Sequence, residues 1–375
     1  MTARRVPLLD LAALHAPIQR EIDAAIRAVV DSQQFILGEA VARLEKQLAA
    51  YCGAVYAIGC ASGSDALYLA LVALGIGAGD RVYVPAFTFF ATAGAVTQAG
   101  AEPVFVDIDE ATFNLDAAHL DKMIREKPDG KAVIAVHLYG GAADMDAIGA
   151  VAARHGLVVI EDGAQSIGGE YNDRRLLSIG RIGCLSFFPT KNLGCFGDGG
   201  MLTANDAELA ERLRALRVHG SRERYRHDEV GVNSRLDALQ AAVLLAKAPY
   251  LDEWTQARQR NAALYTGLLE DVAEVELPRA AAYQTRHVFN QYVIRCQRRD
   301  ELKAHLAGQG VGSEIYYPIP LHLQPCYEGL GYREGQLPAS EQACREVLAL
   351  PVHSALTGAD IEYVCGRLRE FYGTV

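Results

Sequence analysis

Short β-branched runs alternate with amphipathic runs between residues 55 and 205, and this alternation constrains the fold more than any other sequence feature. The β-branched runs predict buried strands at Val55–Gly59, Arg81–Pro85, Pro103–Ile108, Ala132–His137, Val158–Glu161, Cys184–Phe188 and Met201–Thr203. The runs between the first five predict helices at Ala66–Leu74, Ala91–Gln98, Leu115–Ile124 and Met145–His155. Such alternation requires crossover connections, so we expect an α/β fold whose mostly parallel sheet is covered by helices on both faces.

The length of 375 residues exceeds what one hydrophobic core of typical size accommodates, so we expect two domains. A helical zone at residues 236–268, with a break at Pro249, precedes a change in composition. Beyond it we predict a strand at His287–Arg295, a helix at Glu301–Gln309 and an extended segment at Ser313–Pro320. We therefore predict a helical arm (the first 35 residues) and a large α/β domain in residues 1–251, and a smaller α+β domain in residues 252–375.

Charge and cysteine spacing exclude several classes of protein. The net charge of −10 argues against a nucleic-acid binder, because such proteins carry a basic surface. The eight cysteines include no CxxC pair, so we expect no zinc site or disulfide framework and a cytoplasmic protein with reduced thiols. We also expect no signal peptide and no membrane association, because no segment approaches the roughly 20 apolar residues of a membrane helix.

Four of the predicted strands end in residues that could bind a ligand or take part in catalysis. Ligands of open α/β sheets bind beyond the carboxyl ends of strands. The first end continues as Ser62-Gly63-Ser64-Asp65 into a helix. Free N–H groups at a helix start and the helix dipole both favour an anion, so this turn can hold a phosphate. A plain N-cap at Ser62 or Ser64 is the alternative.

The second end places Glu161 and Asp162 directly after a buried apolar strand. A buried carboxylate needs a partner. For Asp162 the partner could be a metal, a helix N-terminus or a protonated heterocyclic nitrogen. The alternative to a functional role is that Asp162 is a structural cap.

The third end carries Lys191, just past the strand at Cys184–Phe188 and before the glycine-rich segment Gly197–Gly200. Glycines allow a backbone to approach a ligand closely. A lysine that forms a Schiff base needs a partly desolvated site in which it can be a free amine. A solvated surface lysine is the alternative.

The fourth end, Phe87-Thr88-Phe89-Phe90, either contributes rings to the core or exposes one ring that can stack on a flat cofactor. Together the four ends offer a turn that can bind phosphate, a carboxylate, an amine and an aromatic ring that can stack on a ligand. Pyridoxal phosphate (PLP) requires these parts. Asp162 would favour the protonated form of the PLP ring by pairing with its nitrogen.

Six segments in this order give the chain a resemblance to a known family over nearly its whole length. They are SGSDAL at 62–67, PAFTFFAT at 85–92, EDGAQS at 161–166, SFFPTKN at 186–192, GDGG at 197–200 and GVNSRLD at 231–237. The chain resembles the DegT/DnrJ/EryC1/StrS sugar aminotransferases. The resemblance implies a PLP-dependent aminotransferase of fold type I that works as a homodimer with shared active sites.

Two catalytic residues follow from the resemblance. Lys191 would hold PLP as a Schiff base and shuttle protons, and Asp162 would pair with the pyridine nitrogen. Gln165 would lie near the ring oxygen of the cofactor, and Phe89 would stack on its ring.

The resemblance also implies how the phosphate of PLP is held. The turn at Gly63 would present the N–H groups of Ser64 and Asp65, with the Asp65 carboxylate pointing elsewhere. The hydroxyl of Ser186 would contribute from the same chain, and Asn233 would reach the phosphate from the partner subunit.

Further residues are predicted to bind the substrate. Arg235 shares a motif with Asn233, and Tyr316, Tyr317 and His322 match the segment that faces the substrate in the family. A buried structural role is the alternative for His322. The basic run at 219–227 either binds a nucleotide diphosphate or is a solvated loop.

The implied activity is transfer of an amino group from L-glutamate to a keto sugar nucleotide, with pyridoxamine phosphate as the intermediate form of the cofactor. The residues around Lys191 and at 197–200 resemble those of family members that act on 3-keto sugars, which implies that the substrate is a 3-keto hexose linked to UDP or dTDP. The reaction would belong to amino-sugar biosynthesis for a surface polysaccharide or glycosylated metabolite. The alternatives are a non-catalytic regulator with a PLP fold and an aminotransferase that acts at C-4 or on a keto-cyclitol. A Rossmann oxidoreductase is disfavoured because no G-x-G-x-x-G follows the first strand.

Overall fold

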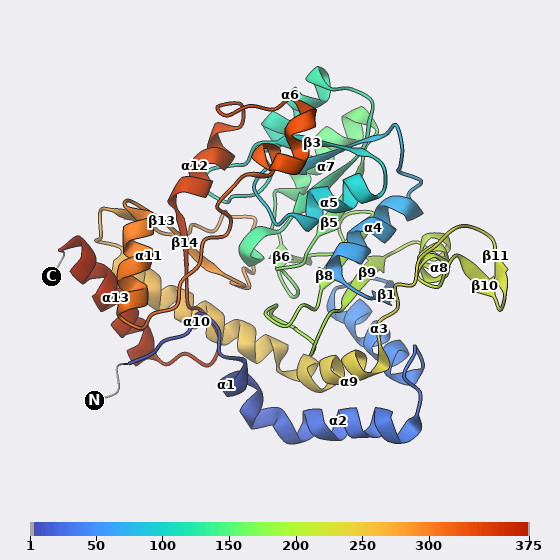
Figure 1. Ribbon diagram of the computed structural model, residues 1–375, viewed down its shortest axis with the longest axis horizontal. Coiled ribbons are helices and arrows are strands. Elements are labelled where there is room, and N and C mark those ends of the chain that lie inside the picture. Colours follow the sequence, from blue (N-terminus) through green and yellow to red (C-terminus); the bar gives the residue numbers. More distant parts are fainter. Residues whose placement is uncertain (1–3, 374–375) are drawn as a thin grey trace.

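A seven-stranded sheet forms the centre of the computed structural model, which describes residues 4–373 (Figure 1). Its order is β1 (Tyr56–Cys60), β9 (Gly200–Ala204), β8 (Ile182–Ser186), β5 (Val158–Asp162), β4 (Gly130–Val136), β2 (Arg81–Pro85) and β3 (Glu102–Val106). The strands from β8 to β3 pair in parallel, and β9 is antiparallel to both of its neighbours. The predicted mostly parallel, mixed sheet is confirmed.

Most predicted elements differ from the observed ones by one to three residues at their ends, and β2, α5 (Ala91–Gln98) and α7 (Met145–His155) have the predicted bounds. The predicted strand Cys184–Phe188 begins and ends two residues too late. It ends at Ser186 because the carbonyl of Phe187 accepts the N–H of Cys195 from the following loop, at 2.8 Å, instead of a strand neighbour. That early end places Phe188 and Lys191 in the loop beyond the sheet.

Side chains that alternate along the strands build one apolar core on each face of the sheet. Val82 and Val84 pack in the core on the face covered by α4 (Gly63–Ala73), α5 and α8 (Ala207–Leu216). Tyr83 lies in the opposite core, under α3 (Glu39–Tyr51), α6 (Ala117–Glu126), α7 and α9 (Ala238–Lys247). Burial of strands on both faces explains why they form nearly continuous apolar runs in the sequence.

The N-terminal arm is helical, as predicted. It consists of α1 (Leu11–His15), a 3-10 turn at Ala16–Ile18 and α2 (Gln19–Ser32), which lies alongside α9 (Figure 1). The predicted break at Pro249 is also present, because a 3-10 turn at Ala248–Tyr250 separates α9 from α10 (Leu251–Leu269).

The C-terminal part contains an antiparallel sheet of β12 (Val275–Glu276), β13 (Tyr292–Cys296) and β14 (Val347–Leu350). It packs with α10, α11 (Arg299–Gly308) and α13 (Gly358–Tyr372) around a third core, and α12 (Pro338–Glu346) precedes β14. Short strands also form the hairpins β6–β7 (Glu170–Tyr171, Arg174–Arg175) and β10–β11 (Ser221–Glu223, Arg226–His227). The second hairpin projects from the body at the right of Figure 1.

The predicted strand His287–Arg295 begins only at Tyr292. The carbonyls of residues 287–290 accept side-chain donors: Gln259 to His287, Asn192 to Val288, and Arg258 to Phe289 and Asn290. Because those carbonyls are not available to a neighbouring strand, this stretch is a loop beside the strand ends of the large sheet.

Contacts cross the predicted domain boundary. Val6, from the N-terminal arm, pairs with Val311 and lies in the C-terminal core. Leu321, Tyr327 and Leu337 pack in the core of the large sheet. The division at residues 251 and 252 stays a prediction. In the part of the chain that the structure describes, no helix is long and apolar enough to span a membrane.

Gly200→Ala should destabilise the protein, whereas Gly149→Ala should not. A Cβ atom at Gly200 would lie 2.2 Å from the carbonyl oxygen of Ser62, while one at Gly149 within α7 meets nothing within 4 Å. We expect a loss of about 1–3 kcal/mol in unfolding free energy for Gly200→Ala and a gain of about 0.5–1 kcal/mol for Gly149→Ala. Equal denaturation midpoints for the two variants would contradict the close contact between β9 and the start of α4.

Candidate active site

A cavity of about 410 Å³ opens at the carboxyl ends of the parallel strands, where ligands of such sheets bind. Its wall comes from the start of α4, the ends of β5 and β8, the segment after β2, the loop that follows β8, and the tyrosine pair at residues 316 and 317. Most of the residues predicted to bind a cofactor meet here. They are Gly63, Ser64, Phe89, Asp162, Gln165, Ser186 and Lys191.

Asp162 ends β5 and is only 5% exposed. Its Oδ2 accepts the Thr92 hydroxyl at 2.8 Å, and its Oδ1 accepts the N–H of Ala164 at 3.2 Å. Burial raises the pKa of Asp162, and the two hydrogen bonds and the nearby Lys191 oppose that shift. A cation brought to the free side of this carboxylate would be strongly stabilised.

Lys191 lies on the same cavity wall, and the structure gives its Nζ no hydrogen bond or ion pair with any described residue. Burial lowers the pKa of Lys191 to about 8, and the charge of Asp162 partly opposes the shift. Near neutral pH a minor but appreciable fraction of Lys191 is therefore a neutral, nucleophilic amine.

The loop that carries Lys191 is fixed at several points. The N–H of Lys191 donates to the carbonyl of Phe188 at 2.9 Å, and the Asn192 amide donates to Val288 at 3.1 Å. From α9, the ammonium of Lys247, only 1% exposed, donates to the carbonyl of Gly194. These contacts restrict where the Lys191 side chain can go.

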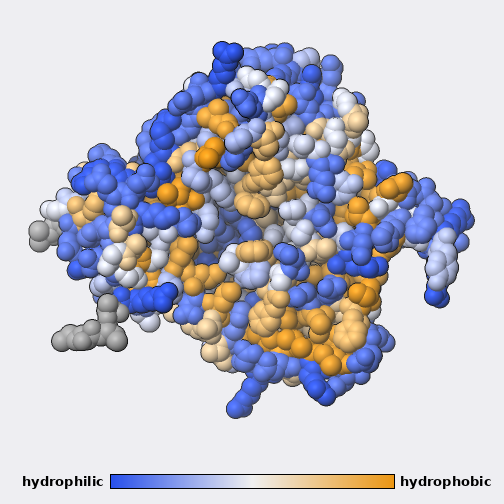
Figure 2. Space-filling view, in the orientation of Figure 1, coloured by the Kyte–Doolittle hydropathy of each residue, from blue (hydrophilic) through white to orange (hydrophobic). Residues whose placement is uncertain are grey.

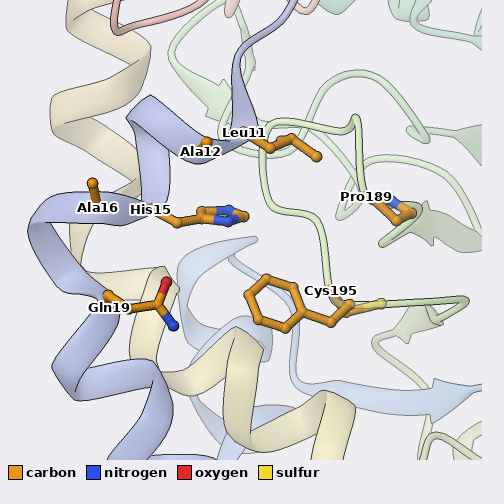
Figure 3. Close-up of a pocket in the computed structure, with 8 residues that line it drawn as sticks. Leu11, Ala12, His15, Ala16, Gln19, Pro189 and Cys195 are labelled. Carbon is orange, nitrogen blue, oxygen red and sulfur yellow. The ribbon is translucent and has the colours of Figure 1, made fainter.

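The N-terminal arm covers the outer side of the same loop. Figure 3 shows His15 of α1 pointing from the arm toward the segment that contains Cys195. The His15 ring lies 5.2 Å from the ring of Phe196, and residues of α1 and the loop together line a shallow pocket. The arm thus contacts the outer side of the Lys191 loop and does not line the active-site cavity.

The start of α4 supplies N–H groups that are free to bind an anion. Ser62 is the N-cap, and its hydroxyl accepts the N–H of Asp65 at 3.1 Å. Ser62 is therefore an N-cap, which was the alternative prediction for this residue. The contact occupies the N–H of Asp65, which was expected to bind phosphate. The N–H groups of Gly63 and Ser64, the first in the helix, have no acceptor in the described chain.

Two further contacts shape this turn. A Cβ atom at Gly63 would lie 2.6 Å from Cβ of Ser186, so glycine allows the turn to approach the end of β8. The Asp65 carboxylate accepts the Ser234 hydroxyl at 2.6 Å and so points away from the cavity, as the resemblance implied. The Ser186 hydroxyl lies close to Gly63, since the same Cβ atom would lie 3.0 Å from its Oγ.

Gln165, Phe89 and Tyr317 surround the space between Asp162 and the cavity mouth. Gln165 accepts the N–H of Tyr139 at 2.6 Å and donates to the Tyr317 hydroxyl at 3.2 Å, which fixes its amide. Phe89 is 55% exposed, and its ring centre lies 6.0 Å from that of Tyr317. An exposed ring at a strand end is available to stack on a planar ligand.

Asn233 and Arg235 do not line the cavity of their own chain. Asn233 is exposed, Arg235 is partly exposed, and both precede α9. If they bind the ligand, they do so at the site of a second copy.

The substrate contact predicted for His322 is corrected by the structure. His322 is 1% exposed, lies outside the cavity wall and pairs with Glu341 at 3.1 Å. Its ring packs near Phe105 and Tyr332. The side chain has a structural role, which was the alternative for this residue.

Thr92 is a site residue that the sequence analysis did not single out. It is fully buried, donates to Asp162 and lies 3.3 Å from the hydroxyl of Thr88. The spacing of four residues between two threonines, beside an apolar strand end, was the available signal, because such residues share one face of a helical turn.

Residues 17–369 match the DegT/DnrJ/EryC1/StrS aminotransferase family. The chain belongs to this family. The resemblance noted in the sequence is confirmed.

Three curated relatives extend over nearly the whole chain. A protein of Geobacillus stearothermophilus named "Pleiotropic regulatory protein" is 51% identical over 98% of each chain. A "dTDP-3-amino-3,4,6-trideoxy-alpha-D-glucose transaminase" of Streptomyces venezuelae is 44% identical over 98% of this chain and 96% of its own. A "UDP-2-acetamido-2-deoxy-3-oxo-D-glucuronate aminotransferase" of Pseudomonas aeruginosa is 44% identical over 97% and 99%.

A solved structure agrees with the fold. The crystal structure of DesV from S. venezuelae, determined in complex with a ketimine intermediate, matches with a TM-score of 0.96 at 44% identity. The match covers 99% of each chain. The fold is that of the PLP-dependent aminotransferases of this family, as the sequence predicted.

The reactivity of Lys191 should depend on pH with a midpoint of about 8. Burial disfavours the ammonium, so the neutral amine should form on raising the pH through this value, and acetylation of Lys191 in cofactor-free protein should accelerate there. Asp162→Asn removes a charge that favours the ammonium, so it should move the midpoint to lower pH. Mass spectrometry of the peptide that contains Lys191 measures the acetylation rate in wild type and in Asp162→Asn. A higher midpoint in Asp162→Asn than in wild type would contradict the proximity of the two groups.

Proposed function

We propose that this chain is a PLP-dependent aminotransferase that moves an amino group from L-glutamate to a keto sugar nucleotide, a 3-keto hexose linked to UDP or dTDP. It acts in the cytoplasm, in the biosynthesis of an amino sugar for a surface polysaccharide or glycosylated metabolite. The observation that carries the proposal is the unpaired amine of Lys191 on the same cavity wall as the buried carboxylate of Asp162. Relatives that act on dTDP-linked and UDP-linked sugars support the substrate class.

The residues of the cavity fit PLP. The free N–H groups of Gly63 and Ser64, with the Ser186 hydroxyl, suit its phosphate. Asp162 suits a protonated pyridine nitrogen, Gln165 the ring oxygen, and exposed Phe89 the flat ring. When bound, PLP supplies an aldehyde that joins an amine and a protonated ring that takes up the electrons of a broken C–H bond.

The side chains of this chain then perform defined tasks. Asp162 holds the proton on the ring nitrogen, and Thr92 orients Asp162 through its hydrogen bond to Oδ2. Lys191 would hold the cofactor through its amine and, once that amine is free, would carry a proton to and from the substrate carbon that bears the amino group. Its lowered pKa suits this exchange, because both protonation states are available near neutral pH.

We propose that the active unit is a homodimer in which each site includes residues of both chains. Asn233 would bind the PLP phosphate and Arg235 the sugar nucleotide of the partner's site, since neither reaches its own cavity. Apolar side chains gather on the surface above α2 in the view of Figure 2, as expected for a face that another chain covers. Tyr316 and Tyr317 would contact the sugar at the cavity mouth.

A regulatory protein without catalysis is the second candidate, because one relative carries a regulatory name. The unpaired Lys191 amine and the buried Asp162 carboxylate favour the enzyme, since both line one cavity and neither is fully paired within the described chain.

Lys191→Ala should abolish amino transfer. The wild-type protein with PLP should show a visible absorption band that changes when L-glutamate is added, because the linkage to the cofactor is replaced. In Lys191→Ala that band and turnover should both be lost, while Lys46→Ala, on the exposed side of α3, should behave as wild type. Retained turnover in Lys191→Ala would overturn the proposed function.

Hybrid dimers test the shared sites. Lys191→Ala and the double variant Asn233→Ala/Arg235→Ala should each have little activity alone. In hybrids, one site regains the intact lysine and the intact partner residues, so an equal mixture should recover about a quarter of wild-type activity in a two-fold dimer. If all of these residues act within one chain, the mixture will recover nothing.

A further inference from the structure

A second, smaller cavity of about 130 Å³ adjoins the active-site cavity. The two cavities share Thr190, Gln291 and Tyr316 in their walls. Thr190 directly precedes Lys191 in the chain, so the smaller cavity lies beside the loop that carries the reactive amine. Its other polar wall residues are Arg258 of α10 and Asn290.

Arg258 is a buried cation without an anion. It is 5% exposed, and no carboxylate of the described chain forms an ion pair with it. Its Nη1 donates to the carbonyls of Phe289 at 3.1 Å and Asn290 at 3.3 Å, and the structure gives Nε and Nη2 no acceptor in the described chain. Burial lowers the pKa of Arg258 to about 10, so the side chain is charged at neutral pH.

A buried charge without a counter-ion is costly, and a guanidinium has a fork of N–H groups that matches a carboxylate. The amide oxygens of Asn290 and Gln291, in the same wall, also have no hydrogen-bond donor among residues 4–373. A carboxamide can turn to accept from an ammonium or to donate to a carboxylate. The small cavity therefore presents unpaired groups complementary to an amino acid.

The active-site cavity itself offers no other cation for an anionic donor. In the described chain Lys191 is the one basic side chain in its wall, and Lys191 is committed to the amine chemistry. Arg235 does not line its own cavity, and across the proposed dimer we assign it to the sugar nucleotide. We infer that Arg258 binds a carboxylate of the amino donor, a dicarboxylic amino acid, in the small cavity beside Lys191.

This inference rests on the proposed function, because it assigns the donor subsite of that reaction. Its rival is a purely structural role, in which Arg258 only clamps the loop at residues 287–290. Gln259 provides a matched control, since it also donates from α10 to that loop, at 2.9 Å to the carbonyl of His287, but lines neither cavity.

The experiment compares wild type, Arg258→Met, Arg258→Lys and Gln259→Leu as PLP-loaded dimers. Calorimetry measures the affinity for glutarate, an unreactive dicarboxylate, and single-turnover spectra follow the half-reactions with L-glutamate and with the keto sugar nucleotide separately. Arg258→Met should weaken glutarate and L-glutamate binding about 10- to 100-fold, as for the loss of hydrogen bonds to a charged group. The sugar half-reaction should stay near the wild-type rate.

Arg258→Lys keeps the charge without the fork and should give an intermediate loss; it also tests the inference if Arg258→Met does not fold. Unchanged glutarate affinity in the folded Arg258 variants overturns the subsite. Equal losses in both half-reactions, reproduced by Gln259→Leu, show a structural clamp and overturn it as well. If wild type binds glutarate through Arg258 yet never transfers an amino group from L-glutamate, the proposed function fails while the carboxylate site stands.

Discussion

The parallel pairing of β5 with β8 is the interaction on which the rest of the site depends. It sets Asp162 opposite Cys184, so the carboxylate at the end of one strand lies beside the start of the loop that carries Lys191. Burial removes both groups from water, which raises the pKa of Asp162 and lowers the pKa of Lys191. The sheet holds an acid and an amine close together while neither is fully satisfied by the protein, which prepares the site for a ligand that carries a cationic ring and an aldehyde.

Several elements outside the sheet hold this arrangement in place. Helix α9 fixes the Lys191 loop through Lys247, and α10 fixes the neighbouring loop at residues 287–290 through Arg258 and Gln259. Both helices follow the Asn233–Arg235 segment, which we propose to complete the partner's site. The segment that runs from Asn233 into α9 therefore links the loop of Lys191 in one site to residues assigned to the other.

The sequence was sufficient for the sheet, for the helices that cover it and for the residues at the strand ends, because continuous apolar runs and polar residues at strand ends are local patterns. It was not sufficient where tertiary contacts decide the outcome. The strand predicted from His287 became a loop because distant side chains take its carbonyls, and the Asp65 amide is occupied by its own N-cap. The sequence could not distinguish a structural role of His322 from a substrate contact, since its pairing with Glu341 and its packing near Phe105 depend on the tertiary structure.

The central claim is that the cofactor is joined to Lys191, and borohydride reduction of the PLP-loaded protein followed by peptide mapping tests it directly. The chain has a real competitor in Lys247, a fully buried lysine whose pKa burial also lowers to about 8. The account predicts that the reduced cofactor is found on the peptide that contains Lys191. Recovery of the label on Lys247, on any other lysine, or on no peptide at all would contradict it.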